Sequence, residues 1–244
     1  MINPTPATGS VTPKPDDRDG PLPALLLILT FITGLVDAVS YLKLGNVFVA
    51  NMTGNIVFLG FAIAGAQNFS IPASLAALAA FLVGALAGGY LGSKAGQHRG
   101  RYLAIVILTK LLLVGAALVT AITIAHPEDI QFGRYLLIAL LALAMGLQNA
   151  AARRLAVADL TTTVLTLTLT GLAADSTLAG GKNPRPGRRL AATIAMLLGA
   201  GVGAFLVLNV GIASVLALTL ALLVLTGVAS YRAASSSEPW TVAA

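Results

Sequence analysis

Cysteine is absent from the 244 residues, and charged, aromatic and histidine residues are scarce. The lack of cysteine excludes disulfide frameworks, thiolate metal sites and cysteine nucleophiles. His98 and His126 lie in polar segments with no second metal ligand at helical spacing, so we expect no metal site. Charged residues make up 10% of the chain and hydrophobic residues 57%, whereas soluble domains are about one quarter charged. This balance is typical of a membrane protein.

The charge that is present is mostly basic, with a formal net charge of +6. The basic residues form short clusters between apolar runs, and no aromatic platform for base stacking lies beside them. We therefore expect no nucleic-acid partner, and we interpret the clusters as residues that hold loops in the cytoplasm. The expected partners are the lipid bilayer and an unidentified small solute or ion, with homo-oligomerisation left open.

Eight apolar stretches lie between two polar tails, 1–23 and 231–244, which we predict to be disordered. A spanning helix needs about 20 mostly apolar residues, so most of the stretches qualify by length. The second stretch contains the polar pentad Asn51-Met52-Thr53-Gly54-Asn55, and the sixth contains six threonines. We predict a single membrane domain over 24–230, with stretches at 24–44, 47–66, 71–93, 102–125, 135–152, 160–178, 190–209 and 211–230.

The two halves of this domain resemble each other, which indicates a duplicated unit. Matching residues are separated by a distance that grows only slightly along the chain, from 112 to 115 positions. We therefore predict repeat one at 24–125 and repeat two at 135–230, each with four apolar stretches. The matches are Gly34-Leu35-Val36-Asp37-Ala38 with Gly146-Leu147-Gln148-Asn149-Ala150, Thr53 with Thr166, and Gly84/Gly88 with Gly199/Gly203.

Lysines and arginines discriminate between two topologies. If all eight stretches cross the membrane, eight of these residues lie on one side and six on the other. This difference is too small to determine the orientation of the protein in the membrane. If the second and sixth stretches enter and return, twelve lie on one side and only Lys43 and Arg134 on the other, a strong positive-inside signal. Each half then has three spans, so the halves insert in opposite orientations. We predict an all-α polytopic membrane protein with two inverted repeats, six spanning helices, two re-entrant or broken segments and both termini cytoplasmic; eight spanning helices remain the alternative.

Two charged residues lie within the apolar stretches. Asp37 is midway along the first, where a carboxylate is costly and usually faces the bundle interior or a water-filled path. It is either a proton or cation site, or a group whose hydrogen bond or ion pair holds a helix break. Lys110 lies in the fourth stretch, where it either extends to the cytoplasmic interface or pairs with Asp37 across the bundle.

Polar residues of the two interrupted stretches are candidates for lining a solute path. Gly54 loosens the helix, and the side chains around it either satisfy freed backbone groups, line a pore or join neighbouring helices. Threonines of the sixth stretch also bond to their own helix carbonyls. The full set of candidate path residues is Asp37, Asn51, Thr53, Asn55, Lys110, Asn149, Thr163 and Thr166.

Catalytic motifs are not evident. Gly-Ser-Lys at 92–94 and Gly-Gly-Lys at 180–182 lack the rest of a phosphate-binding loop. No serine–histidine or paired-carboxylate arrangement lies in the apolar stretches. We therefore expect no enzymatic activity, no catalytic residue and no cofactor, and we expect the glycine pairs to be helix-packing faces.

Several motifs resemble the YoaK-like family of bacterial integral membrane proteins, domain of unknown function 1275. The resemblance covers about 24–230 and implies a six-span protein of the bacterial plasma (inner) membrane, with no activity attached. Lys110 lies outside the motifs. They are Thr33-Gly34-Leu35-Val36-Asp37-Ala38-Val39-Ser40-Tyr41, Phe48-Val49-Ala50-Asn51-Met52-Thr53-Gly54-Asn55, Met145-Gly146-Leu147-Gln148-Asn149, Asp159-Leu160-Thr161-Thr162-Thr163-Val164-Leu165-Thr166 and Gly171-Leu172-Ala173-Ala174-Asp175.

From these observations we predict a small-solute transporter or channel whose path lies between the two repeats. Two interrupted segments at matching positions favour this hypothesis, because broken helices surround the substrate in many transporters. The alternative is a non-transport membrane protein, an assembly or sensing factor, in which the polar segments only join helices. The substrate, the coupling ion and the direction of transport are not evident from the sequence.

Overall fold

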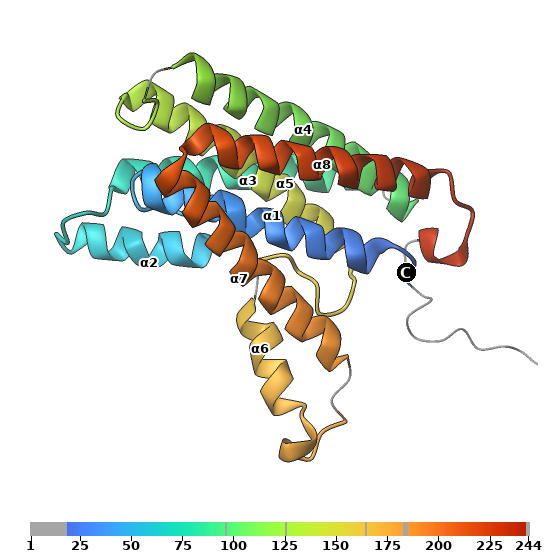
Figure 1. Ribbon diagram of the computed structural model, residues 1–244. Coiled ribbons are helices and arrows are strands. Elements are labelled where there is room, and N and C mark those ends of the chain that lie inside the picture. Colours follow the sequence, from blue (N-terminus) through green and yellow to red (C-terminus); the bar gives the residue numbers. More distant parts are fainter. Residues whose placement is uncertain (1–18, 96, 125, 164, 183–184, 243–244) are drawn as a thin grey trace, which may run out of the picture.

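The computed structural model describes residues 19–242 with the exception of 96, 125, 164 and 183–184 (Figure 1). Residues 1–18, most of the predicted N-terminal tail, lie outside this part. Six of the helices are long and apolar enough to cross a membrane, which confirms the prediction of an all-α polytopic membrane protein. They are α1 (Leu22–Lys43), α3 (Ile71–Ala95), α4 (Arg99–Thr123), α5 (Gln131–Leu155), α7 (Pro186–Asn209) and α8 (Ile212–Ala234).

Two further helices, α2 (Met52–Ile63) and α6 (Leu165–Ala174), are too short to span. Their 12 and 10 residues rise about 18 and 15 Å, against a hydrocarbon layer of about 30 Å. The chain turns back before each of them through residues in the left-handed conformation, such as Gly45 and Asn46 before α2 and Asp159 and Thr162 before α6. The alternative of eight spanning helices is therefore wrong.

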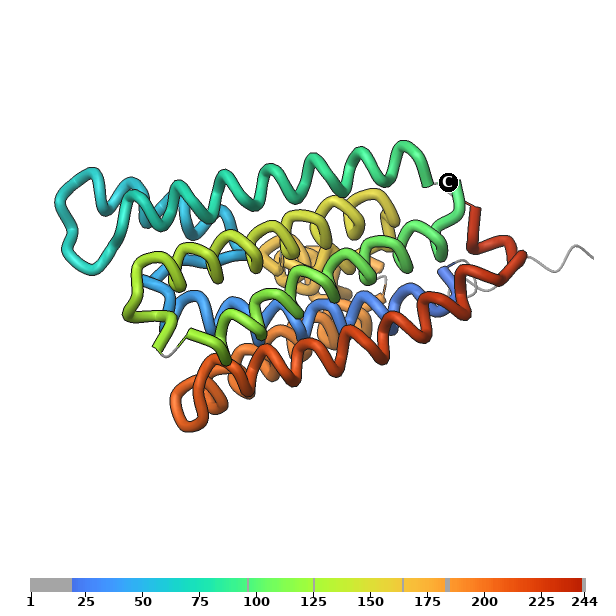
Figure 2. Tube along the Cα trace, turned by 90° about the horizontal axis from the view of Figure 1, so that it is seen from above, coloured from blue at the N-terminus to red at the C-terminus, as the bar shows by residue number. Residues whose placement is uncertain are grey.

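The long helices pack in three main pairs. Helix α3 packs against α5, α1 against α7, and α4 against α8, and Figure 2 shows the first and third of these pairs side by side. Figure 1 shows α6 and the first half of α7 diverging from the other helices. The α3–α5 and α1–α7 pairs each join one helix from the first half of the chain to one from the second.

Glycines allow the backbones of these pairs to approach closely. A Cβ on Gly84 of α3 would overlap the carbonyl group of Leu143 on α5, and a Cβ on Gly199 of α7 would overlap that of Phe31 on α1. Gly88 and Gly203 make the same kind of close approach to α5 and α1, respectively. The prediction that these glycine pairs form packing faces is confirmed.

The equivalent contacts recur at matching residues of the two pairs. A Cβ on Gly146 would meet the carbonyl oxygen of Phe81 and the amide of Ala85. A Cβ on Gly34 would meet the carbonyl oxygen of Met196 and the amide of Ala200. The glycine contacts between α3 and α5 therefore recur at matching residues between α7 and α1. The residue numbers of equivalent contacts differ by 112 or 115, the same separations as between the matching residues of the sequence repeat.

One end of the bundle is held together by Arg99, the first residue of α4. Its guanidinium donates to the Asp19 carboxylate at 3.2 Å, to the Trp240 carbonyl at 3.3 Å and to the Leu155 carbonyl. Arg188 of α7 bonds the same carboxylate at 3.2 Å. The start of α1 and the end of α5 therefore lie at one face, so these two helices run in opposite directions (Figure 1).

The described part of the C-terminal tail continues from the end of α8 at Ala234 into a 3-10 helix at Pro239–Thr241. Trp240 lies in a 3-10 helix, is only 9% exposed, and packs over Gly20. The Ser236 carbonyl lies 3.0 Å from His98 Nε2. One buried aromatic side chain offsets the low overall hydrophobicity of this segment. At the other end, α1 begins at Leu22, inside the tail predicted over 1–23.

Candidate functional site

Asp37 holds the turn between α1 and α2. It lies six residues before the end of α1 and is 5% exposed. Its Oδ1 accepts hydrogen bonds from the backbone amides of Val49 at 3.3 Å and Ala50 at 3.0 Å. These two amides precede α2 and have no partner within a helix, so the carboxylate satisfies donors that would otherwise be buried and unpaired. Asp37 thus makes the hydrogen bonds predicted for a residue that holds a helix break.

Asn55, in the first turns of α2, fixes the same turn from the other side. Its amide bonds both backbone groups of Phe48, accepting from the N–H at 2.8 Å and donating to the carbonyl at 2.6 Å. The side chain is fully buried and its main hydrogen-bonding groups are used. Asn51 and Thr53 are exposed on the structure. These contacts favour a structural role for Asn55, which stabilises the turn, over a role in lining a solute path.

Asn149 occupies the equivalent place in the second half. It lies six residues before the end of α5, and its Nδ2 donates to the Met145 carbonyl at 2.9 Å. Its Oδ1 accepts from the hydroxyl of Thr163, in the turn that leads to α6. Thr166 is exposed on α6. The two turns are thus held by the same device, a polar side chain near the end of a long helix, with different donors.

Lys110 is fully buried at the meeting of α1, α4 and α5. Its ammonium donates to Gln148 Oε1, and Gln148 Nε2 donates to the Thr33 hydroxyl at 2.9 Å. Among the described residues, no carboxylate lies within ion-pair distance of this ammonium. Both interpretations of Lys110 are therefore wrong: the side chain neither extends to the interface nor pairs with Asp37. Gln148 was not predicted as the partner of Lys110. The only feature of Gln148 visible in the sequence was its position next to Asn149.

Arg189, also absent from the sequence-based candidates, clamps the second short helix. Its Nε lies 2.9 Å from Asp159 Oδ1 before α6, and its Nη1 lies 2.8 Å from Asp175 Oδ2 after α6. Arg185 adds a contact of 3.6 Å to Asp159. Gly171 lies directly against the guanidinium, where a Cβ would not fit. The sequence motif with Gly171 and Asp175 contains two of the residues that contact Arg189. No feature of the sequence indicated Arg189 itself.

A cavity of about 910 Å³ lies between α3, α5 and the segment that leads to α6. Phe81, Ala85 and Gly89 line it from α3. The polar part of its wall comes from the second half of the chain and consists of Asn149, Arg153, Arg154, Asp159 and Thr161. Of the predicted path residues, the cavity includes Asn149, whereas Asp37 and Lys110 make their bonds elsewhere in the bundle.

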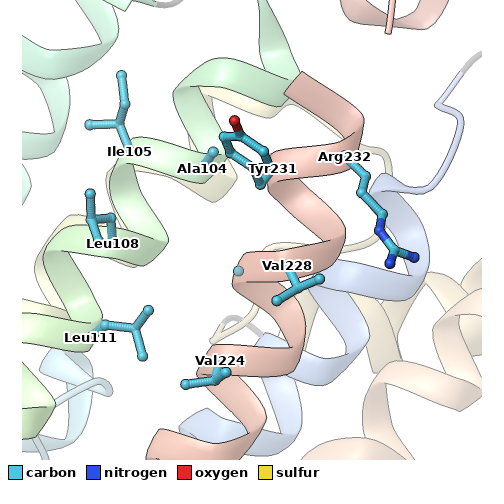
Figure 3. Close-up of a pocket in the computed structure, with 9 residues that line it drawn as sticks. Ala104, Ile105, Leu108, Leu111, Val224, Val228, Tyr231 and Arg232 are labelled. Carbon is cyan, nitrogen blue, oxygen red and sulfur yellow. The ribbon is translucent and has the colours of Figure 1, made fainter. Parts of the chain in front are cut away.

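A second hollow, of about 630 Å³, lies between α4 and α8. Figure 3 shows its lining: apolar side chains such as Leu108, Leu111 and Val224 along most of its length, with Tyr231 and Arg232 toward one end. An apolar groove on the outside of a spanning bundle is suited to lipid chains. It contains none of the predicted path residues.

The described residues include one group of metal-type ligands, on the turn between α4 and α5. His126, Glu128 and Asp129 present ligand atoms within 4.8 Å of one another. His126 Nδ1 lies 3.8 Å from the Glu128 carboxylate. His126 and Asp129 are exposed, and exposed acidic groups of this kind are common without an ion, so we assign no metal site here.

Comparisons with known proteins identify a family and a transmembrane relative. The sequence model of a family described as "Protein of unknown function (DUF1275)" matches residues 25–229. The UPF0700 transmembrane protein YoaK of Bacillus subtilis (strain 168) is 36% identical over 151 residues, 62% of this chain. The matched region spans 65% of the length of that relative. No solved structure matches the chain.

Proposed function

The chain belongs to the DUF1275 family, whose description names no activity. We therefore propose a function from the geometry of the structure. The protein is a small-solute transporter or channel of the bacterial plasma membrane, with its path between two inverted repeats. It carries no enzymatic activity. The position of the cavity carries the proposal, and the relation between the two halves and the charge at one face support it.

The inverted repeat is supported by the recurring contacts of α3 with α5 and of α7 with α1. Matching helices α1 and α5 run in opposite directions, and each carries its polar residue, Asp37 or Asn149, six residues from its end. At a rise of 1.5 Å per residue, each lies about 9 Å below the end of its helix. The two turns are therefore close to opposite faces, as an inverted pair of re-entrant segments requires.

The single observation that carries the proposal is the position of the cavity. It lies at the interface between α3 of the first half and α5 of the second. This is the place predicted for a path, and Asn149, a predicted path residue, is in its wall. The non-helical segment at 156–161, which follows the end of α5, also borders the cavity.

The face that contains this cavity is proposed to be cytoplasmic. Arg99, Arg153, Arg154 and Arg188 all lie at or beside it, and short loops rich in lysine and arginine stay on the cytoplasmic side. Asp19 and Trp240, near the two ends of the described part of the chain, belong to the same face, because both bond Arg99. A solute in the cavity would then exchange with the cytoplasm.

A second candidate, a non-transport assembly or sensing factor, is favoured by one observation. The polar groups of Asp37 and Asn55 are occupied by backbone groups of the turn at 48–50. In this alternative the polar residues stabilise the fold, and the cavity is a packing defect that solutes do not enter.

Cysteine accessibility separates the two candidates, and the cysteine-free chain makes it simple. Asn149→Cys and Ala158→Cys, in the cavity wall, are exposed to a small hydrophilic thiol reagent in inside-out vesicles. Leu225→Cys on α8, where the native leucine is 65% exposed, is the matched control for the lipid-facing surface. The transporter proposal expects fast modification of the first two and slow modification of the control. Equal, slow modification of all three would support the alternative.

A further inference from the structure

The cavity between α3 and α5 has a distinctly cationic wall. Arg153 and Arg154 form the last turn of α5 and both line the cavity. Both are exposed, and in the described part of the chain neither guanidinium has a carboxylate or hydrogen-bond acceptor as partner. The C-terminus of α5 stabilises positive charge nearby. This interaction does not use the N–H donors of the two guanidiniums.

The carboxylate in the wall does not neutralise these arginines. Asp159 is held by Arg189 at 2.9 Å and by Arg185 at 3.6 Å. Arg189 is shared with Asp175. The two aspartates of this region, Asp159 and Asp175, thus bond Arg185 and Arg189, and no described carboxylate is paired with Arg153 or Arg154.

The neutral polar residues of the wall are Asn149 and Thr161. Asn149 uses its oxygen for Thr163 and its nitrogen for the Met145 carbonyl. The charged donors of the wall are the guanidiniums of Arg153 and Arg154, and guanidiniums match planar or tetrahedral oxyanions and bind them in a bidentate manner. At about 910 Å³, the cavity is of the size that holds metabolite-sized ligands, about 300–1,000 Å³.

We infer that this cavity binds a small anion bearing a carboxylate or phosphate group, through Arg153 and Arg154. The inference deepens the proposed transport function, on which its biological meaning rests, by naming the substrate class. An oxyanion of this kind has two sources, a free solute or the head group of an anionic lipid. Both sources share the chemistry, and the experiment separates them.

The test is binding, measured on the purified full-length protein by thermal unfolding. Trp240, the single tryptophan, is 9% exposed and reports unfolding by its fluorescence. Inorganic phosphate and succinate are added to protein in neutral detergent, with choline chloride at matched ionic strength as the control. A second arm compares lipid nanodiscs of phosphatidylglycerol and phosphatidylcholine. The variant Arg153→Gln/Arg154→Gln is compared with Arg232→Gln, which changes an exposed arginine in the last turn of α8.

The inference expects a saturable rise in melting temperature with phosphate or succinate and a loss of at least tenfold in apparent affinity in the double variant. Arg232→Gln should behave as wild type. A response to phosphatidylglycerol alone, lost in the double variant, also supports the anion site and identifies the lipid as its source. No response to either anion source, or an equal loss in Arg232→Gln, overturns the inference. Because no flux is measured, a failure here leaves the transport proposal standing, and binding without flux would refute only that proposal.

Discussion

The backbone amide of Ala50 donates a 3.0 Å hydrogen bond to the carboxylate of Asp37, across the turn that joins α1 to α2. The bond assigns a structural task to an acidic residue that the sequence places deep in an apolar helix. Its counterpart in the second half is an asparagine, which makes the same connection to Thr163 with an amide. An amide is therefore an adequate acceptor at this place, which leads to the first prediction.

Asp37→Asn should fold and reach the membrane at near wild-type abundance, because the amide oxygen can accept from Val49 and Ala50. Asp37→Leu should be destabilised, since two buried amides lose their acceptor at a cost of about 1–3 kcal/mol each. Abundance in membranes and melting temperature in detergent measure both. Equal stability of Asp37→Leu and wild type would show that the turn does not depend on these bonds. Normal flux in Asp37→Asn would also remove a titrating role for this residue.

Lys110 and Gln148 should be energetically coupled. Gln148→Leu leaves a buried ammonium without its acceptor, and hydrogen bonds to charged groups contribute about 1.5–3 kcal/mol. The double variant Lys110→Met/Gln148→Leu removes both polar groups, so we expect it to recover most of the stability lost in Gln148→Leu. A double-mutant cycle on melting temperatures provides the measurement. The matched cycle of Lys110→Met with Asp37→Asn should give additive effects, and strong coupling there would contradict the described contacts.

Glycines at matching positions should respond alike to substitution. Gly84→Ala and Gly199→Ala each place a Cβ against a carbonyl group of the facing helix, on Leu143 and Phe31, respectively. Overpacking of this kind costs about 1–3 kcal/mol, so both variants should melt at lower temperature by similar amounts. Gly201→Ala, where nothing lies within 4 Å of the added Cβ, is the control and should melt no lower than wild type. A loss in only one of the two glycine variants would argue against equivalent interfaces.

The proposed topology predicts which loops are accessible from outside the cell. A cysteine at Asp129, on the turn between α4 and α5, should react with an impermeant thiol reagent added to intact cells. A cysteine at Gly187, at the start of α7, should react only after the membrane is opened. Both native residues are exposed, so burial does not confound the comparison. The reverse labelling pattern would invert the topology.

Much of the fold could be predicted from the sequence because the bilayer imposes strong constraints on it. Apolar runs of sufficient length produced the six spans, and the pentad around Gly54 marked the position of α2. The sequence repeat aligned Asp37 with Asn149. In the structure each of them accepts hydrogen bonds from the turn that precedes a short helix. Residues that meet across helices were not predictable in the same way. Which side chain faces Lys110 depends on the rotation of α5 against α4, and only packing determines this.

The parts of the site that come from loops were also hidden. Arg189 contacts Asp159 and Asp175 because the α6 segment folds back on α7, which spacing alone does not indicate. The arginines of the cavity wall were assigned only to topology, since a positive-inside cluster and an anion-binding wall have the same composition. Trp240 stabilises a tail that is polar on average. In each case the missing information was the three-dimensional proximity of residues far apart in the chain.

Flux through the purified protein tests the central claim most directly, that a path lies between the two repeats. The protein carrying Ala158→Cys is reconstituted into liposomes, and uptake of radiolabelled phosphate, succinate, glycerol and choline is measured before and after modification with a bulky thiol reagent. The account predicts saturable uptake of at least one solute above empty liposomes and its loss on modification at residue 158. Modification of Leu225→Cys, on the lipid-facing surface, should leave uptake unchanged. No uptake of any of the four solutes, or uptake that is insensitive to modification at residue 158, would contradict it.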